Sequence, residues 1–441
     1  MRISSCYLLA KCYEKTQKLD IREKIFKELS SDDTPMVRRA IAINLGEFAT
    51  VIDPPYDDIL TAYKALLNDQ QDAVKIESLK TSTKLARILA RHDYYDKLEE
   101  DILISVKNAS KDKNSWRLRF SVAELVDELT EIVGTELAEK HIKEIIEALL
   151  GDSEPEVRSE IIIKVTKVVD SINPSDVLDK LMLITKDQSQ HVRESLAECI
   201  CKIAEHVDPD AFVEKAIPGM LQLVKDAATE VRVSILNHIQ IVTRSIGKEN
   251  TQNHIIPALL ELTTDKQWRV RYGITQFFPK FAEVFGKDLY LDKLEKVSLD
   301  LLIDSVYKIR EQSMMNLVDL KKTLGTDWFE RICKEKIREF ARSDKCGIRQ
   351  QAIFMTKIIY KDIETDVLNK DLIPVIVGLK DDIVPNIKFN IAKLLDELSQ
   401  ILSREIIFIS KSALENMRDN DADDDVKYFS EKTLKNPVFK D

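Results

Sequence analysis

The chain has 441 residues, of which 44% are apolar and 32% charged, and this composition excludes an intrinsically disordered protein. Its net charge of −10 disfavours nonspecific binding to nucleic acid or to an anionic membrane, and no apolar run approaches the roughly 20 residues of a membrane span. Ten glycines and twelve prolines are few for this length, which favours long helices over turn-rich β structure.

The N-terminal stretch MRISSCYLLAKCYEK carries a short apolar patch that Lys11 interrupts, which is unlike a signal peptide. The six cysteines are scattered and form no CxxC pair, so we expect reduced thiols and a location in the cytoplasm or nucleus.

An apolar residue followed by a basic one recurs along the chain, after each of eleven short polar stretches. The apolar members, here called register residues, are Val37, Val74, Leu118, Val157, Val192, Val231, Val270, Ile309, Ile348, Ile387 and Val426.

The register residues are 39 residues apart from Val192 onward, and 35 to 44 apart before it. An Asp stands five residues before the register residue in nine repeats, and the other two repeats keep an Asp one residue away, at Asp112 and Asp344. We expect this Asp to accept N–H groups at the start of a helix, and the Asp and the basic residue to form a charge ladder along stacked repeats. Such regular spacing indicates an array of supersecondary units.

Each unit is predicted to contain two antiparallel helices. Apolar residues follow Val270 at helical spacing, at Ile274, Phe278, Phe281 and Phe285, and therefore share one face. Four glycines lie sixteen residues after their register residue, where a left-handed helix cap would favour glycine. We expect each second helix to begin within about two residues of its register residue, and 22 to 24 helices in total. The fold class is all-α: a HEAT-repeat α-solenoid over residues 1–441, with about eleven full repeats and a partial first repeat.

No pattern indicates a catalytic, cofactor or metal site. The six histidines are dispersed, and Cys199 and Cys201 point about 200° apart on a predicted helix. The stretch from Asp419 to Ser430 resembles a calcium loop but lacks its Gly and its final Glu. We therefore expect neither an enzyme nor a cofactor.

The position two residues before the register residue holds proline or polar residues in most repeats, so it is not a core position. Three repeats place an aromatic residue there, each followed by a cation. These pairs are Trp116 with Arg117, Trp268 with Arg269, and Tyr307 with Lys308. Because the turns within the repeats all project along one ridge, exposed aromatic and arginine residues on it resemble the hot spots of protein interfaces.

Five stretches closely resemble the scaffold (A, 65 kDa-type regulatory) subunit of protein phosphatase 2A. They are SDDTPMVRRAIAINLGEFATVID, NSWRLRFSVAEL, KQWRVRYGITQFFP, SVYKIREQSMMNLV and DVKYFSEKTL. The resemblance runs repeat by repeat along the chain. It implies a noncatalytic scaffold in the form of a right-handed superhelical horseshoe. Residues 1–200 would form the side for a regulatory (B-type) subunit, and residues 255–441 the side for the phosphatase catalytic subunit.

The resemblance also implies interface residues. Those for the regulatory subunit are Pro35, Arg38, Arg39, Ser115, Trp116 and Arg117. Those for the catalytic subunit are Trp268, Arg269, Tyr307, Lys308, Val384, Asn386, Asp423 and Lys427.

Two alternatives stay open. A nuclear-transport receptor is also an acidic HEAT solenoid, although usually longer. A HEAT-fold enzyme acting on DNA would need a basic concave face, which the acidic balance disfavours. The family's scaffold has several more repeats at its N-terminus, whereas ISSCYLLAKCYEK aligns with a second helix whose first helix is absent. We therefore expect residues 3–13 to expose an apolar face.

Overall fold

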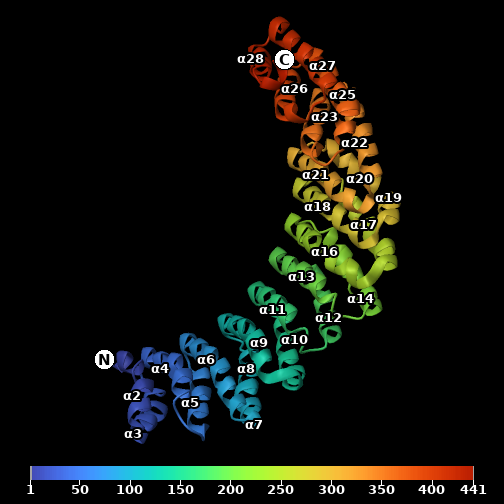
Figure 1. Cartoon of the computed structure of the whole chain (residues 1–441). Helices are drawn as coiled ribbons and strands as arrows, with labels where there is room; N and C mark the ends of the chain where they lie inside the picture. Colours follow the sequence, from blue (N-terminus) through green and yellow to red (C-terminus); the bar gives the residue numbers. More distant parts are fainter. Residues whose placement is uncertain (1, 441) are drawn as a thin grey trace. The chain divides into compact units, whose positions relative to one another are not determined.

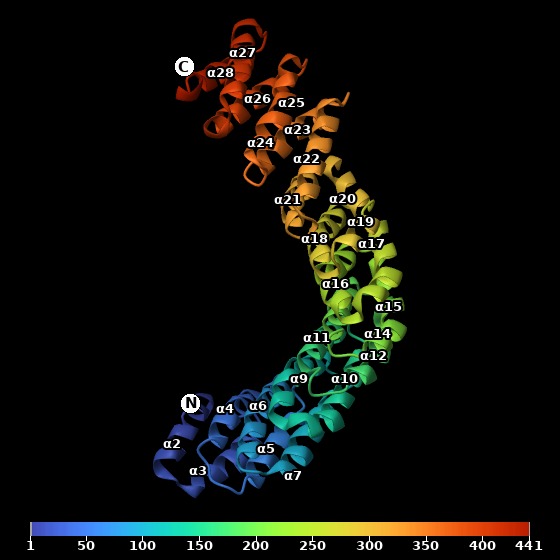
Figure 2. The ribbon, with the colours of Figure 1, turned by 45° about the vertical axis from the view of Figure 1, so that its right-hand side comes forward.

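The structure is a computed structural model that describes residues 2–440. These residues form helices joined by short turns and contain no strand. The chain divides into two compact units, residues 1–254 and residues 255–441. Within each unit, successive helices lie beside one another in chain order and form two layers, one of first helices and one of second helices (Figures 1 and 2). The prediction of an all-α solenoid of helix pairs is confirmed.

The second helices begin two residues before the register residue in all eleven repeats. In the first unit they are α4 (Pro35–Ala49), α6 (Asp72–Arg91), α9 (Trp116–Leu137), α11 (Pro155–Val168), α13 (Gln190–Ile203) and α16 (Thr229–Asn250). In the second unit they are α18 (Trp268–Phe285), α21 (Tyr307–Leu324), α23 (Cys346–Ile359), α26 (Pro385–Leu398) and α28 (Asp424–Leu434). Within each unit, consecutive second helices pack against each other.

The first helices are more broken than expected, which takes the described residues to 28 α-helical segments instead of 22 to 24. In the first unit they are α3 (Leu19–Glu23) with η1 (Lys24–Leu29), α5 (Asp57–Leu67), α7 (Tyr95–Lys97) with η2 (Leu98–Leu103) and α8 (Ile104–Ala109), η3 (Ala138–Ile142) with α10 (Lys143–Leu150), α12 (Pro174–Leu183) with η4 (Ile184–Lys186), and α14 (Pro209–Lys215) with α15 (Ile217–Val224).

In the second unit the first helices are α17 (Ile256–Leu262), α19 (Lys287–Lys293) with α20 (Glu295–Asp300) and η6 (Leu301–Ile303), α22 (Thr326–Ala341), α24 (Thr365–Val367) with η7 (Leu368–Leu372), α25 (Ile373–Val377) and η8 (Gly378–Asp381), and α27 (Arg404–Asn420). The π turn η5 (Thr251–Ile255) precedes α17, and the 3₁₀ turns η9 (Ser399–Ile401) and η10 (Pro437–Phe439) follow α26 and α28. Several interruptions lie next to a proline, at Pro218, Pro257 and Pro374, because proline removes a helical N–H and its ring displaces the preceding turn.

The core of each repeat is the apolar face predicted from the spacing. In α18, Ile274, Phe278 and Phe281 are buried, and the Phe281 and Phe285 rings lie 4.6 Å apart. Near the N-terminus, the side chains of Ile3 in α1 (Arg2–Cys6) and of Tyr7 and Leu8, in the turn before α2 (Leu9–Thr16), are exposed, as expected. Cys6 and Tyr13 of the same segment are nevertheless buried, since α1 and α2 pack against α4.

The four predicted cap glycines have a positive φ, but their conformation is not the left-handed helical cap that we expected. Gly286 has φ 84° and ψ 174°, and Gly134, Gly247 and Gly325 are similar, with ψ between 159° and 178°. This region of backbone space is accessible to little besides glycine. The extended ψ turns the chain directly from a second helix into the next first helix without a loop, which a left-handed cap would not do.

Replacing Gly286 with alanine should therefore destabilise the fold by about 1–3 kcal/mol through backbone strain alone. An added Cβ would meet no atom within 4 Å, so no steric clash contributes. Gly347→Ala is the matched control, because Gly347 also has open space but lies in the first turn of α23 without a positive φ. That control should be neutral or stabilising by about 0.4–1 kcal/mol. Urea unfolding followed by circular dichroism measures both, and equal effects of the two substitutions would contradict the role of φ.

Candidate protein-binding ridge

The turn between the two helices of a repeat is built on its aspartate. Asp304 Oδ1 accepts a hydrogen bond from the Val306 N–H at 2.8 Å, and Asp265 and Asp382 do the same with the N–H two residues later. The arginine after the register residue closes the turn from the other side, since Arg271 Nη1 donates to the backbone carbonyl of Asp265 at 2.7 Å. The backbone of the turn from Asp265 to Arg271 is therefore fixed by hydrogen bonds from both ends.

The same arginine also reaches the aspartate of the following repeat, which forms the predicted ladder. Arg271 donates from Nε to Asp304 Oδ2 at 2.7 Å and from Nη2 to Oδ1 at 2.9 Å, and the two side chains are 13% and 8% exposed. Equivalent pairs in the first unit are Arg38–Asp69, Lys75–Asp112, Arg119–Asp152, Arg158–Asp187 and Arg193–Asp226. Those in the second unit, besides Arg271–Asp304, are Arg349–Asp382 and Lys388–Asp421. Because the pairs join neighbouring repeats and are largely buried, they hold successive turns in register.

Asp112 and Asp344, the two displaced aspartates, behave differently from each other. Asp112 joins the ladder: it pairs with Lys75 at 3.1 Å and accepts the N–H groups of Asn114 and Ser115. Asp344 is exposed and pairs with no cation in residues 2–440, whereas Ser343 occupies the aspartate position of its turn. The expectation that Asp344 substitutes for a ladder aspartate is wrong.

Seven ladder aspartates have a pKa below the ordinary value of 3.8. They are Asp69, Asp112, Asp152, Asp226, Asp304, Asp382 and Asp421. Burial by itself would raise the pKa of these carboxyls, but hydrogen bonds from the paired cation and from the turn N–H groups outweigh it.

The lowered pKa of these aspartates predicts how the stability of the fold depends on pH. A carboxyl whose pKa is lower in the folded state binds fewer protons there than in the unfolded chain, so its contribution is complete above the unfolded pKa of about 4 and is lost as pH falls through the folded value. We expect the free energy of unfolding, measured by urea denaturation, to fall steadily below about pH 4. Asp304→Asn should flatten that dependence, and an unchanged slope in this variant would contradict the contribution of the ladder.

The ridge of the second unit, here the turns from Asp265 to Asp425, exposes aromatic and apolar side chains. Trp268 is the first residue of α18 and is 40% exposed, and Tyr307 is the first residue of α21 and is 52% exposed. The Arg269 guanidinium lies 5.7 Å from the centre of the Trp268 ring, and Lys308 Nζ pairs with Glu311 at 2.9 Å. Both predicted aromatic–cation pairs therefore lie on the surface.

Sequence reasoning missed two further apolar residues on this ridge, Ile303 and Ile383, which are 46% and 90% exposed. They flank the ladder aspartates Asp304 and Asp382. Other repeats place mostly polar residues directly after the aspartate, so Ile383, which follows Asp382, was a usable signal.

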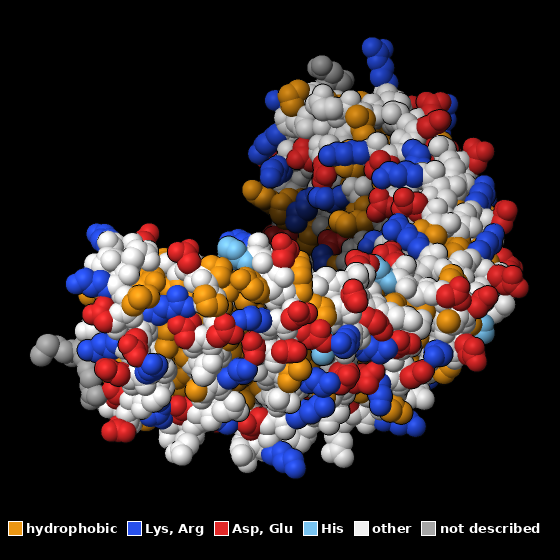
Figure 3. All heavy atoms as spheres, turned by 90° about the horizontal axis from the view of Figure 1, so that it is seen from below, with side chains coloured by type: hydrophobic (Ala, Val, Ile, Leu, Met, Phe, Trp, Pro, Cys, Tyr) orange, Lys and Arg blue, Asp and Glu red, His pale blue; other side chains and the backbone are white. Residues whose placement is uncertain are grey.

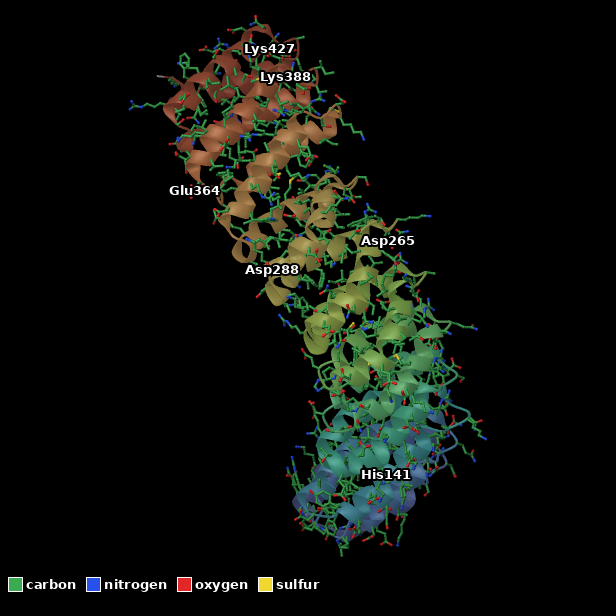
Figure 4. The ribbon with its side chains drawn as sticks, turned by 90° about the vertical axis from the view of Figure 1, so that its right-hand side faces the viewer. His141, Asp265, Asp288, Glu364, Lys388 and Lys427 are labelled. Carbon is green, nitrogen blue, oxygen red and sulfur yellow. The ribbon has the colours of Figure 1, made fainter. Side chains whose placement is uncertain are left out.

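The other predicted residues of this ridge lie in the last two turns. Val384 is half-buried and Asn386 is exposed. Asp423 caps α28 by accepting the N–H groups of Asp425 and Val426. Lys427 is half-buried and has no ion pair in the part of the chain described; Figure 4 labels it on α28 together with Lys388 on the adjacent α26.

The ridge of the first unit, here the turns from Asp32 to Glu230, is less uniform. Trp116 is half-buried against Phe120, with the Arg117 guanidinium 4.8 Å from its ring centre. Trp116 lines a groove of about 370 Å³ together with Lys111, Lys113 and other turn residues.

Ser115, which precedes Trp116, faces inward. Its side chain is only 3% exposed, and its hydroxyl accepts the Leu118 N–H as a helix cap. This hydrogen bond fixes the start of α9 and leaves the hydroxyl little access to a partner.

The first full repeat places Pro35 and the unpredicted Met36 on the surface of this ridge. Arg38 belongs to the ladder, and Arg39 pairs with Glu77 at 2.9 Å. Arg38, like Ser115, thus has a structural role in the chain, and the implied contacts of all these residues with a partner stay predictions.

Residues 2–440 contain no group of His, Cys, Asp or Glu side chains that could hold a metal ion. No helix among them has the length and apolar character that crossing a membrane requires.

A family model described as PPP2R1A-like HEAT repeat matches residues 135–207. The PP2A regulatory A protein of Schizosaccharomyces pombe, a protein phosphatase subunit, is 29% identical over 142 residues, which are 31% of this chain and 23% of that protein. The beta isoform of the human 65 kDa regulatory A subunit of serine/threonine-protein phosphatase 2A is 51% identical over 55 residues, which are 12% of this chain and 9% of that protein. The matched segments thus span less than a quarter of these relatives.

Among solved structures, Kap121p bound to Pho4p superposes with a TM-score of 0.60 at 14% identity, over 95% of this chain and 45% of Kap121p. Kap121p bound to RanGTP gives 0.59 at 14% identity, over 98% of this chain and 51% of that one. At this identity the likeness establishes the fold alone. The chain is a HEAT-repeat solenoid that is similar in sequence to phosphatase 2A regulatory A subunits over limited segments.

Proposed function

We propose that the chain is a noncatalytic scaffold that assembles a protein phosphatase 2A type of serine/threonine phosphatase. The ridge of the second unit holds the catalytic subunit, and the ridge of the first unit holds a regulatory subunit. The observation that carries the proposal is the exposure of Trp268 beside Arg269, and of Tyr307 beside Lys308, on consecutive turns. The sequence similarity to phosphatase 2A regulatory A subunits supports a phosphatase 2A subunit as the partner.

The chemistry of these turns suits a protein partner. A docked surface that covers the Trp268 indole and the Tyr307 ring removes a large apolar area from water, and Trp, Tyr and Arg dominate binding energy in protein interfaces. Ile303 and Ile383 extend the apolar area to the neighbouring turns.

The ladder gives these side chains a fixed spacing. Arg271 ties the turn of Trp268 to Asp304, which lies three residues before Tyr307. A partner therefore meets both aromatic rings in a preformed arrangement, which lowers the entropy lost on binding.

The other interpretations differ in their partners. A nuclear-transport receptor would bind a small GTPase, and the Kap121p likeness supports the shared fold without distinguishing function. A DNA-acting enzyme would need a basic face, whereas basic and acidic side chains are interspersed on the face in Figure 3. Within our proposal the chain acts in the cytoplasm or nucleus and needs no cofactor, nucleic acid or membrane.

The test is affinity purification of the tagged chain followed by mass spectrometry, and then reconstitution with purified phosphatase 2A catalytic subunit. Recovery of a stoichiometric complex is the expected result. Recovery of a Ran-type GTPase in place of the phosphatase would instead favour the transport receptor, and a salt-dependent DNA mobility shift would favour the DNA-acting enzyme.

A further inference from the structure

The ladder has a gap in the second unit at Arg310. This residue follows the register residue Ile309, and its Nη1 donates to the backbone carbonyls of Asp304 and Ser305 at 2.7 Å and 3.0 Å, as the ladder arginines do in their own turns. Its guanidinium has no carboxylate partner in residues 2–440, and its Nε is buried without a hydrogen bond. A guanidinium with an unused Nε–Nη2 edge is a site for a bidentate carboxylate.

The missing carboxylate is explained by one residue. The other arginine pairs of this unit join residues 33 apart, Arg271 with Asp304 and Arg349 with Asp382, and the residue 33 positions after Arg310 is Ser343. The turn itself is unchanged: Ser343 Oγ accepts the Lys345 N–H at 3.3 Å, and the Ser343 carbonyl accepts Arg349 Nη1 at 3.0 Å. The turn thus keeps the hydrogen bonds of the aspartate-containing turns, but a serine stands where their carboxylate would be.

The surroundings of Arg310 favour an incoming anion. Its guanidinium lies 5.7 Å from the centre of the half-exposed Tyr307 ring. Lys308 and Lys345 are exposed on the two turns that flank the gap. Two acidic residues near the gap oppose an incoming anion: Asp344 is exposed and forms no ion pair in the described chain, and Glu311, directly after Arg310, pairs with Lys308 at 2.9 Å.

We propose that an acidic side chain of the docked catalytic subunit fills this gap, pairing with Arg310 where the other repeats use their own aspartate. The inference rests on the proposed function, because it assigns the partner to the ridge of the second unit. It adds a specificity element: a partner that covers Tyr307 must also present an Asp or Glu at this one turn.

The sequence offers a charge-neutral test, since Ser343 and Asp344 are adjacent. The double substitution Ser343→Asp/Asp344→Ser moves a carboxylate by one residue into the ladder position without changing net charge. We expect this exchange to raise the thermal unfolding midpoint of the free chain, because it completes the ladder. We expect it to weaken catalytic-subunit binding about tenfold, because Arg310 is then occupied.

Two controls accompany the exchange. Asp344→Ser alone should not weaken binding, since it leaves the gap open. Arg310→Gln should weaken binding about tenfold in the natural sequence and should have little further effect in the exchanged variant, because the same interaction is already lost.

The outcomes separate the two proposals. If Trp268→Ala weakens binding while the exchange and Arg310→Gln leave it unchanged, the gap is not a partner site and the scaffold function stands. If the unsubstituted chain does not bind the catalytic subunit, both proposals are wrong. An exchange that raises the unfolding midpoint and weakens binding, with Arg310→Gln silent in its background, supports the inference.

Discussion

Trp268→Ala should weaken the binding of phosphatase catalytic subunit by a factor of at least about 30, which corresponds to roughly 2 kcal/mol. The indole is 40% exposed in the free chain, and the core of α18 is already filled by buried residues such as Phe278 and Phe281. Removing the ring should therefore change the thermal unfolding midpoint of the free scaffold little, since surface substitutions usually stay within about 0.5 kcal/mol. Calorimetric or surface-plasmon titration gives the affinity, and a thermal scan gives the stability.

Two other tryptophans serve as controls for Trp268. Trp328→Ala should destabilise the free chain by about 3–5 kcal/mol, because Trp328 is buried and its Nε1 donates to Glu295 at 2.6 Å. Trp116→Ala lies on the ridge of the first unit and should leave binding of the catalytic subunit unchanged. A Trp268→Ala variant that loses stability like Trp328→Ala, with unchanged binding, would show that Trp268 is a core residue and that the ridge argument is wrong.

The starts of the second helices could be predicted to within about two residues because three local signals coincide there. Val270 shows all three: an Asp lies five residues before it, a basic residue follows it directly, and apolar residues follow at helical spacing. The helix α18 begins two residues before Val270, as expected. The first helices carry no comparable start signal. Their breaks depend on how a proline such as Pro257 or Pro374 is accommodated between neighbouring helices, which spacing does not encode.

The glycines show the difference between a residue preference and a conformation. A glycine at position 286 correctly indicated a positive φ, but the ψ of 174° follows from the direction of the next helix, which starts at Lys287 without a loop. Local sequence carries the preference for φ, and tertiary packing decides the ψ.

The candidate site was predictable in position and less so in detail. The exposure of Trp268 followed from comparing one position across repeats, and the same comparison applied to the position after the aspartate would have revealed the exposed Ile383. The failure of Asp344 to join the ladder has a geometric cause. Asp344 stands one residue after the ladder position, which Ser343 occupies, and it forms no ion pair with Arg310, whereas Asp112 lies in a turn that is one residue longer and still reaches Lys75.

Asp304→Ala should destabilise the second unit by about 3 kcal/mol, the low end of the roughly 3–5 kcal/mol that breaking a buried ion pair costs. The substitution leaves the largely buried Arg271 guanidinium without its bidentate partner and also removes the acceptor of the Val306 N–H. Asp304→Asn should cost less, since an amide oxygen can still accept that N–H while the charge is lost. Urea denaturation of the free chain measures both.

Asp344→Ala is the matched control for Asp304→Ala, because Asp344 is an exposed aspartate in the next turn and has no ion pair in residues 2–440. It should change the free energy of unfolding by less than about 0.5 kcal/mol. Because the Arg271–Asp304 pair joins the turn of Trp268 to the turn of Tyr307, Asp304→Ala should also weaken binding of the catalytic subunit, even though neither ring is altered. If Asp304→Ala and Asp344→Ala prove equally mild, the ladder does not hold successive turns in register, and the preformed spacing of the two rings needs another cause.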